Sequence, residues 1–207
     1  MCRLHPAAAK LVLHRFSTAD LPIGQRHEAW RNRDWPSLAP GYRTVPLQPF
    51  DTASDRLRIG PLVVQYSRIS AQRWERDAAM LRSHDPDALN VVITLAGQAR
   101  GVMGARTFRT GAGSVQLCDL AQTSLHESTA SRTVLVSVPR AVAAERGLDV
   151  AGLHGVVLRS SAAAMLGPHL LGLREAVPEL TEEDGPLLAR GFLDLLSVAV
   201  ASSERGA

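Results

Sequence analysis

The segment 87–140 constrains the fold more than any other part of the chain, because it alternates short extended stretches with turn residues. Five stretches have the pattern of strands: 88–95, 106–109, 114–118, 123–127 and 132–138. Glycines interrupt them at Gly97, Gly111 and Gly113. Short strands at close spacing with glycine turns are typical of an antiparallel barrel or sandwich. We therefore predict a mainly β domain with an interior that polar side chains can enter.

The residues before this segment are more varied. Ser17 and Asp20 are helix N-cap candidates and Pro22 suits a first turn, so we predict a helix that continues to Arg33. Residues 34–55 are rich in Pro, Gly and Ser and indicate a loop, and 57–70 supply one or two further strands. The pattern of residues 71–82 fits either a bulged strand or a short helix, and we favour the strand.

After Arg140 the apolar residues follow a helical period. Residues 139–147 fit one or two helical turns ended by a glycine. Ser160 or Ser161 caps a helix that runs to about Ala176, and Thr181 with Asp184 forms a capping box that opens a last helix to about Ser202. We expect these two helices to pair antiparallel across a short acidic loop.

This organisation predicts three regions in the 207 residues. They are an N-terminal arm (1–16), a helix with the barrel (17–140) and a helical region (141–207). The last helix carries more apolar residues than one neighbour would cover, which favours a homodimer through this region. The residues expected to form that contact are Leu188, Phe192, Leu195, Leu196 and Ala199.

Composition narrows the class of protein. The chain is 45% hydrophobic with a net charge of +3, and its basic residues are scattered singly, so we expect weak DNA binding at most. No apolar run approaches the ~20 residues that span a bilayer, and residues 1–10 lack the long apolar region of a signal peptide, so we expect none. Cys2 and Cys118 are isolated thiols that form no disulfide framework. We expect a cytoplasmic protein without membrane contact.

Motifs for catalysis or metal binding are weak. No two histidines stand two residues apart, as strand-borne metal ligands usually do, although His84 and His126 could both point inward. There is no Gly-x-Ser-x-Gly motif, and Gly111-Ala-Gly113 lacks the following helix that phosphate binding needs. We expect no enzyme activity, no metal and no cofactor.

A small-molecule pocket fits the pattern better. Ser124 and His126 share one face of their strand, and Arg132 and Val134 share a face of the next. Arg82 lies just before a turn that could bring it to the same mouth. An inward arginine without an acidic neighbour needs a polar or anionic ligand. The candidate ligand-binding residues are Arg82, Ser124, His126, Arg132 and Val134.

In the order of its motifs the chain resembles the N-terminal effector-binding and dimerisation domain of AraC/XylS-type bacterial transcription regulators. The resemblance covers residues 13–203 and rests on loose motifs in a specific order. The segments that carry it are 16–22 with 26–30, 81–83, 85–97, 110–119, 134–140 and the closing helix pair.

The resemblance implies a cupin-like barrel (a jelly roll) that binds a small effector, with a dimer contact through the C-terminal helices. It also implies that sugar contacts of the arabinose-responsive prototype map onto the five candidate residues, of which only an arginine is retained in type. These regulators continue into a DNA-binding domain with two helix-turn-helix units, and the present chain ends at Ala207. We therefore expect it to be a piece of a longer regulator that contacts DNA only through that further domain.

Two alternatives remain open at this point. The barrel is also compatible with a metal-dependent cupin-type enzyme. A stand-alone regulator that lacks a DNA-binding domain and heterodimerises with a full-length partner is the other. The sequence does not separate these from the effector-binding domain.

Overall fold

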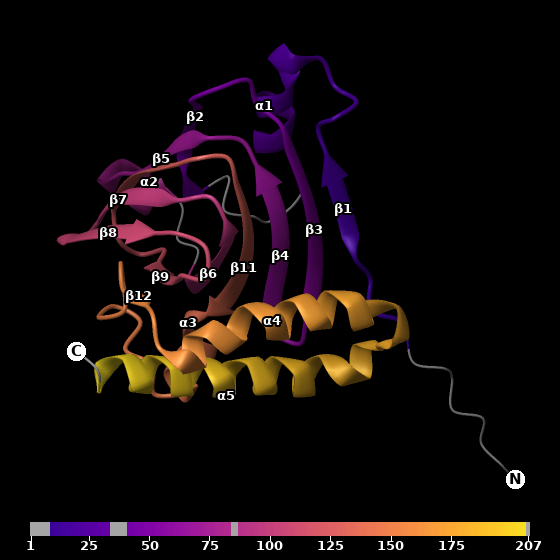
Figure 1. The fold of residues 1–207 in the computed structure, drawn as a ribbon, viewed down its shortest axis with the longest axis vertical. Coiled ribbons are helices and arrows are strands. Elements are labelled where there is room, and N and C mark those ends of the chain that lie inside the picture. The colour runs from indigo at the N-terminus through magenta and orange to yellow at the C-terminus, as the bar shows by residue number, and fades with distance from the viewer. Residues whose placement is uncertain (1–8, 34–40, 84–86, 206–207) are drawn as a thin grey trace, which may run out of the picture.

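The computed structural model describes residues 9–33, 41–83 and 87–205. It contains two antiparallel sheets and a pair of long helices (Figure 1). The strands are β1 (His14–Ser17), β2 (Arg43–Pro46), β3 (Thr52–Ile59), β4 (Leu62–Ile69), β5 (Gln72–Arg76), β6 (Ala88–Ala96), β7 (Ala99–Met103), β8 (Arg106–Thr110), β9 (Val115–Asp119), β10 (Ser124–Ser128), β11 (Ser131–Pro139) and β12 (Val157–Leu158). The helices are α1 (Ile23–Arg31), α2 (Ala78–Ser83), α3 (Arg140–Glu145), α4 (Ser161–Ala176) and α5 (Gly185–Glu204), with short 3-10 turns at Val177–Glu179 and Glu182–Asp184.

The chain crosses repeatedly between the two sheets, as in a jelly roll. The larger sheet has the order β1-β3-β4-β11-β6-β9-β12, and the smaller has the order β2-β5-β10-β7-β8. Every pairing between strands is antiparallel. Tight turns such as the one at Gly60, where φ is +52°, connect neighbouring strands. The strands of the two sheets thus face each other across an interior.

The main hydrophobic core lies between the larger sheet and the helix pair. In Figure 1, α4 and α5 run antiparallel and side by side across one end of the strands. Leu89, Val91 and Ile93 of β6 pack in one cluster with Leu166 and Leu170 of α4. Side chains on a strand alternate between faces, so this stripe leaves the intervening residues of β6 for the interior.

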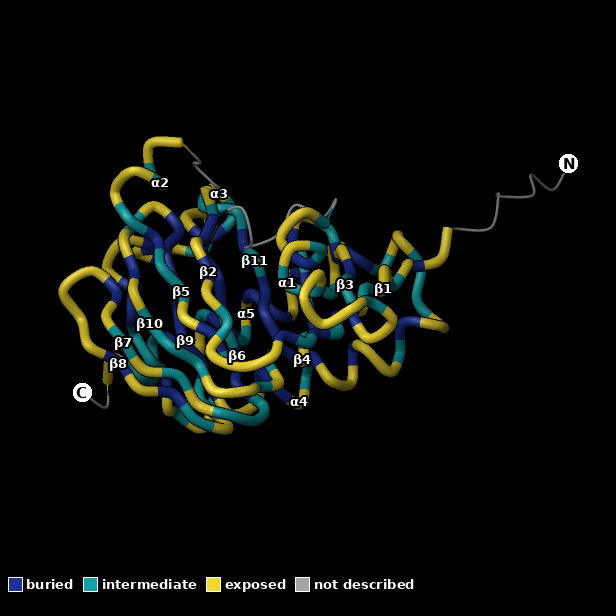
Figure 2. The backbone as a smooth tube through the Cα atoms, turned by 90° about the horizontal axis from the view of Figure 1, so that it is seen from above, coloured by how far each residue is buried: buried dark blue, intermediate teal, exposed yellow. Residues whose placement is uncertain are grey.

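Two smaller apolar clusters border the interior. One contains Tyr42, Met103 and Phe108, and the other is built around Trp30 and Phe50. Figure 2 shows that buried residues follow strands such as β9, whereas many residues of the turns and of α2 are exposed. The main apolar core lies against the helices, and the space between the sheets is partly polar.

Most predicted elements are confirmed. The five strands of 87–140 appear as β6, β8, β9, β10 and β11, and Ser160 caps α4 by accepting a hydrogen bond from the Ala163 backbone N–H. The capping box of Thr181 and Asp184 is present. Residues 71–82 hold both predicted alternatives, the strand β5 followed by the helix α2. The prediction missed the glycine-containing strand β7 and the two-residue strand β12.

The N-terminal third differs from the prediction. The end of the predicted arm is strand β1, which pairs with β3, and the predicted helix begins later, at Ile23. The predicted loop 34–55 contains β2 and the start of β3. Tertiary pairing explains these differences, because edge strands form where a sheet offers free hydrogen-bonding groups. The first eight residues of the arm lie outside the described part of the chain.

The last helix is a core helix, and this corrects the predicted role of several of its residues. Phe192, Leu196 and Ala199 have no exposed surface because they pack against the sheet and α4. Leu188 and Leu195 are partly buried against the same core. The segment Glu182–Glu204 has the length and composition of a membrane-crossing helix, with a mean hydropathy of 1.3. Its packing gives the apolar residues an intramolecular role.

Candidate functional site

A cavity of about 120 Å³ lies between the two sheets. The larger sheet contributes the inward side chains of β4, β6, β9 and β11, and the smaller sheet contributes those of β5, β7, β8 and β10. Trp30 of α1, Arg33 just after that helix, Tyr42 before β2 and Gln98 between β6 and β7 complete the described lining. The cavity is therefore built by elements from most of the chain.

Strand alternation makes the wall of the larger sheet polar. On β6 the inward residues are Asn90, Val92 and Thr94, and on β9 they are Gln116 and Cys118. In the β6–β9 register Asn90 is paired with Cys118 and Val92 with Gln116, so the two amide side chains are diagonal neighbours on one face. Diagonal neighbours on a sheet are about 7–8 Å apart. One small molecule can therefore contact both amides.

The opposite wall is aromatic. Trp74 on β5 stacks on His126 of β10, with ring centroids 5.9 Å apart and the ring planes 12° from parallel. Tyr42 meets both rings edge-on, at 5.9 Å and 6.1 Å. Trp30 meets Trp74 edge-on at 5.9 Å. Planar groups in these orientations present rigid surfaces to whatever lies in the cavity.

Several polar atoms at the cavity have no hydrogen-bond partner among the described residues. They are both amide atoms of Asn90, Nε2 of Gln116, Nδ1 of His126 and Nε of Arg33. Asn90 is 1% exposed and Gln116 is 5% exposed. Buried polar atoms are nearly always bonded, and leaving one unbonded costs about 1–3 kcal/mol. These atoms are therefore the polar groups of the cavity wall that can bond a molecule between the sheets.

The electrostatics of the cavity are simple. Burial lowers the pKa of His126 to about 4, so its ring is neutral at neutral pH. Burial, and then the nearby Arg56, lowers the pKa of Arg33 to about 10, which leaves its guanidinium charged. Burial also raises the pKa of Cys118 to about 11. Arg33 is the single charged group among the described residues that line the cavity.

The structure separates the five predicted ligand-binding residues. His126 lines the cavity, and Ser124 lies buried on the same face of β10, beyond the lining. Arg82 is exposed on α2 and lies away from the cavity lining. Any role of these residues in ligand binding stays a prediction.

The predicted inward orientation of Arg132 and Val134 is corrected. On β11 the residues that line the cavity are Ser131, Thr133 and Leu135. Val134 has no exposed surface and belongs to the helix-facing core. The apolar series of β11 packs on the helices, and strand alternation then places Arg132 outside as well.

Arg132 lies instead in a groove of about 670 Å³ on the outer side of the larger sheet, together with Arg15, Arg68 and Arg174. Asp55 pairs with Arg15 at 3.7 Å and with Arg174. The groove is larger than the internal cavity and more open. The groove has one unbonded buried atom, Ser54 Oγ, whereas the five described above border the internal cavity, which is why we regard that cavity as the candidate site.

Sequence reasoning missed the amide and aromatic lining. Asn90 and Gln116 interrupt otherwise apolar strands, and this was the signal that could have revealed them, because a polar residue in a buried strand needs a partner. Trp30 of α1 also borders the cavity. Among the described residues no cluster of three metal-ligating side chains occurs. His84, a considered ligand, lies outside them.

The fold and the cavity define the class: a cupin-like jelly roll with a polar and aromatic interior and a helix pair on its larger sheet. Residues 43–200 match the family model of the AraC-binding-like domain. The chain therefore belongs to the family of AraC-binding-like domains, as its sequence motifs predicted. No functionally curated protein matches it by sequence.

The crystal structure of the AraC-like transcriptional activator CuxR superimposes with a TM-score of 0.81 at 25% identity. This match covers 91% of the present chain and 70% of the CuxR chain. The Clostridium difficile EutQ protein, at 11% identity, has a TM-score of 0.32 and covers 44% of this chain and 70% of its own. A cupin 2 barrel protein from Salinispora arenicola, at 15% identity, has a TM-score of 0.31, and the match covers 59% of this chain and 93% of that protein's chain.

Proposed function

We propose that this chain is the effector-binding domain of an AraC-type transcription regulator and that a small molecule binds in the cavity between its sheets. The observation that carries the proposal is the set of buried, unbonded polar atoms that border the cavity. An enclosed cavity in which polar groups stand opposite aromatic rings can hold and orient a small molecule. The AraC-like family and the similarity to a transcriptional activator support the regulatory role.

The chemistry of the cavity favours sensing over catalysis. A general acid–base reaction needs a group that exchanges protons near neutral pH. Burial lowers the pKa of His126 to about 4 and raises the pKa of the Cys118 thiol to about 11. The thiol is also hydrogen-bonded to the Tyr42 hydroxyl at 3.2 Å. The described lining includes no carboxylate. We therefore propose a binding domain without enzymatic activity.

A cavity-filling substitution tests this function. Ala99 lines the cavity on β7, whereas Ala105 lies exposed in the turn before β8. We expect at least one compound of a bacterial metabolite library to raise the melting temperature of the wild type and of Ala105→Phe, and not of Ala99→Phe. A library that leaves the wild type unchanged, or that stabilises Ala99→Phe equally, would contradict effector binding in this cavity.

We further propose that the domain forms a homodimer through the outer face of its C-terminal helices. Leu187 and Val198 of α5 are 67% and 53% exposed, and Met165 of α4 is 59% exposed. Partly exposed Leu195 lies on the same helix. Exposed apolar residues on packed helices favour a second protein surface.

Sedimentation tests the dimer. We expect Val198→Asp to shift the protein to monomer, while Val45→Asp, which alters an equally exposed valine (51%) on β2, keeps the dimer. A wild-type monomer would contradict the proposed dimer.

We also propose a cytoplasmic location and contact with DNA through another domain of the regulator. The present chain alone should then leave the mobility of promoter DNA unchanged in a gel.

A further inference from the structure

The size of the cavity limits its occupant to about one ring. Its volume of about 120 Å³ is close to that of a roughly 150 Å³ protein cavity that holds benzene. Drug-sized ligands occupy pockets of about 300–1,000 Å³. The aromatic wall formed by Trp74, His126 and Tyr42 presents flat surfaces along one side. A compact planar ring uses both the volume and that wall.

The lining also selects against cations and sugars. Arg33 repels a positively charged ligand, and the described lining has no carboxylate to offset it. A sugar of the same size has hydroxyls around its whole ring. The polar side chains of the larger sheet can bond some of these hydroxyls, but hydroxyls that face Ile69, Val92, Met103 and Leu135 would stay unbonded.

The unbonded atoms point to the functional groups that a ring must carry. The amides of Asn90 and Gln116 lie diagonally on one wall and offer donors together with an acceptor. The Arg33 guanidinium stands 4.7 Å from the Trp30 ring centroid, and Trp30 lies 5.9 Å from Trp74, so the charge adjoins the aromatic wall. A charged donor with an unbonded, buried Nε favours an anionic partner.

We propose that the occupant is a single-ring aromatic acid, with its ring on the Trp74–His126 wall, a hydroxyl or carbonyl group bonded to Asn90 and Gln116, and its carboxylate paired with Arg33. This inference rests on the proposed effector function and specifies the chemical class of the effector. It makes Arg33 the residue that selects charge and the two amides the residues that select polar ring substituents.

Calorimetry with matched probes tests the class. The probes are para-hydroxybenzoate, para-hydroxybenzamide, para-hydroxybenzylamine and D-xylose. We expect the wild type to bind para-hydroxybenzoate saturably, the amide about tenfold or more weakly, and the amine and xylose not measurably. Equal affinity for the acid and the amide would overturn the role of charge. Binding of xylose without the acid would overturn the aromatic class and leave effector binding intact.

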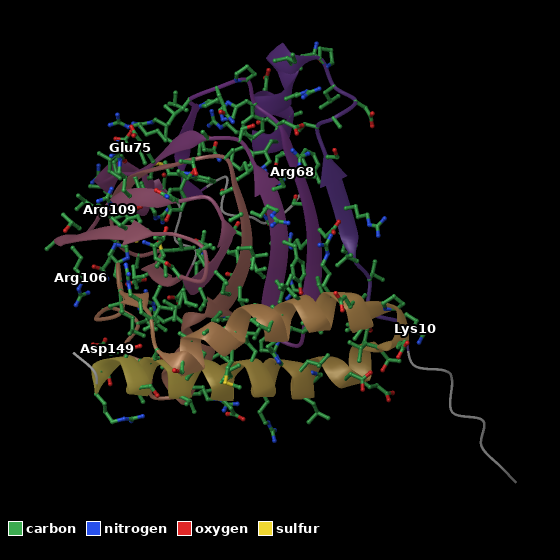
Figure 3. All side chains as sticks on the ribbon, in the orientation of Figure 1. Lys10, Arg68, Glu75, Arg106, Arg109 and Asp149 are labelled. Atoms are coloured by element: carbon green, nitrogen blue, oxygen red, sulfur yellow. The ribbon has the colours of Figure 1, made fainter. Side chains whose placement is uncertain are left out.

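Variants locate the interactions. Arg33→Gln should remove the preference for the acid over the amide, and Arg33→Lys should keep part of it. Gln116→Leu should weaken both probes to a similar degree. Arg109→Gln, on the edge strand β8 (Figure 3), and Gln25→Leu, exposed on α1, serve as controls and should bind like the wild type. A preference that survives in a folded Arg33→Gln protein would overturn the pairing with Arg33.

The outcome in which no probe binds separates the two proposals. It would overturn the aromatic-acid class, whatever the cause. The metabolite library tested on wild type, Ala99→Phe and Ala105→Phe then decides independently whether the cavity binds another effector.

Discussion

The Trp74 indole lies parallel to the His126 imidazole, and the two residues are directly opposed in the register of β5 and β10. The Trp74 Nε1–H donates to the Ser128 hydroxyl at 3.1 Å, which fixes the indole on this wall. Phe108 meets His126 edge-on at 5.7 Å. His126 is thus held among rings, in surroundings that favour its neutral form.

Stability should therefore depend on pH through His126. Its folded pKa of about 4 lies below the ordinary value of 6.5, so the unfolded chain binds a proton first as pH falls. The stability that depends on a neutral His126 is fully present above pH 6.5. It is lost as pH falls towards about 4, by up to about 3 kcal/mol of the free energy of unfolding. Urea denaturation across this range should show a smaller decrease of that free energy for His126→Phe, which keeps a ring and cannot titrate. An unchanged slope would contradict the assignment.

Gly101 permits the close approach of β7 to β10. A Cβ at this position would lie 2.2 Å from the Leu125 carbonyl oxygen and 2.5 Å from the His126 Cα. Gly101→Ala should lower the free energy of unfolding by more than about 2 kcal/mol, because backbone must move. Gly111→Ala is the control, since a Cβ there meets nothing within 4 Å. Equal stability of the two variants by urea denaturation would refute the steric argument.

The ion pair between Arg140 and Asp119 should matter far more than a similar pair on the surface. Asp119 has a side chain 2% exposed, and Arg140 also reaches Asp87 at 2.5 Å. Arg140→Ala leaves the Asp119 charge buried and should cost about 3–5 kcal/mol. Arg146→Ala is a matched control, because both arginines are 29% exposed but Asp194, the partner of Arg146, is 59% exposed.

The control pair should contribute about 0–1 kcal/mol. Thermal and urea unfolding of both variants measure the difference. Losses of the same size would show that burial of Asp119 does not set the strength of its pair.

Asn90 should contribute to ligand binding and not to the stability of the fold. Its amide atoms have no protein partner in the described structure, so Asn90→Leu should leave the free energy of unfolding unchanged or raise it by up to about 2 kcal/mol. The same substitution should abolish binding of para-hydroxybenzoate. Asn32→Leu changes an exposed asparagine and should alter neither quantity by more than about 0.5 kcal/mol. A large loss of stability in Asn90→Leu would instead give the amide a structural role.

Local patterns were sufficient for much of the fold. The alternation in residues 87–140, the cap at Ser160 and the box of Thr181 with Asp184 each depend on neighbours in sequence, and all three were predicted correctly. β7 was missed because Gly101 weakens a strand pattern, although the glycine is needed there by a strand distant in sequence. Strand propensity depends on neighbours in sequence, so it does not reveal a close approach between two strands such as β7 and β10.

The sequence by itself determined the five strands predicted in residues 87–140, the helix pair and the family, because periodicity and order of motifs are properties of the chain. Only the tertiary structure decided which face of each strand looks inward. The helices cover the apolar face of the larger sheet, so Val134 joined the core while Asn90 and Gln116 faced the cavity. The period of a strand gives two faces but does not say which one the helices will cover, and that choice depends on packing between elements far apart in the chain.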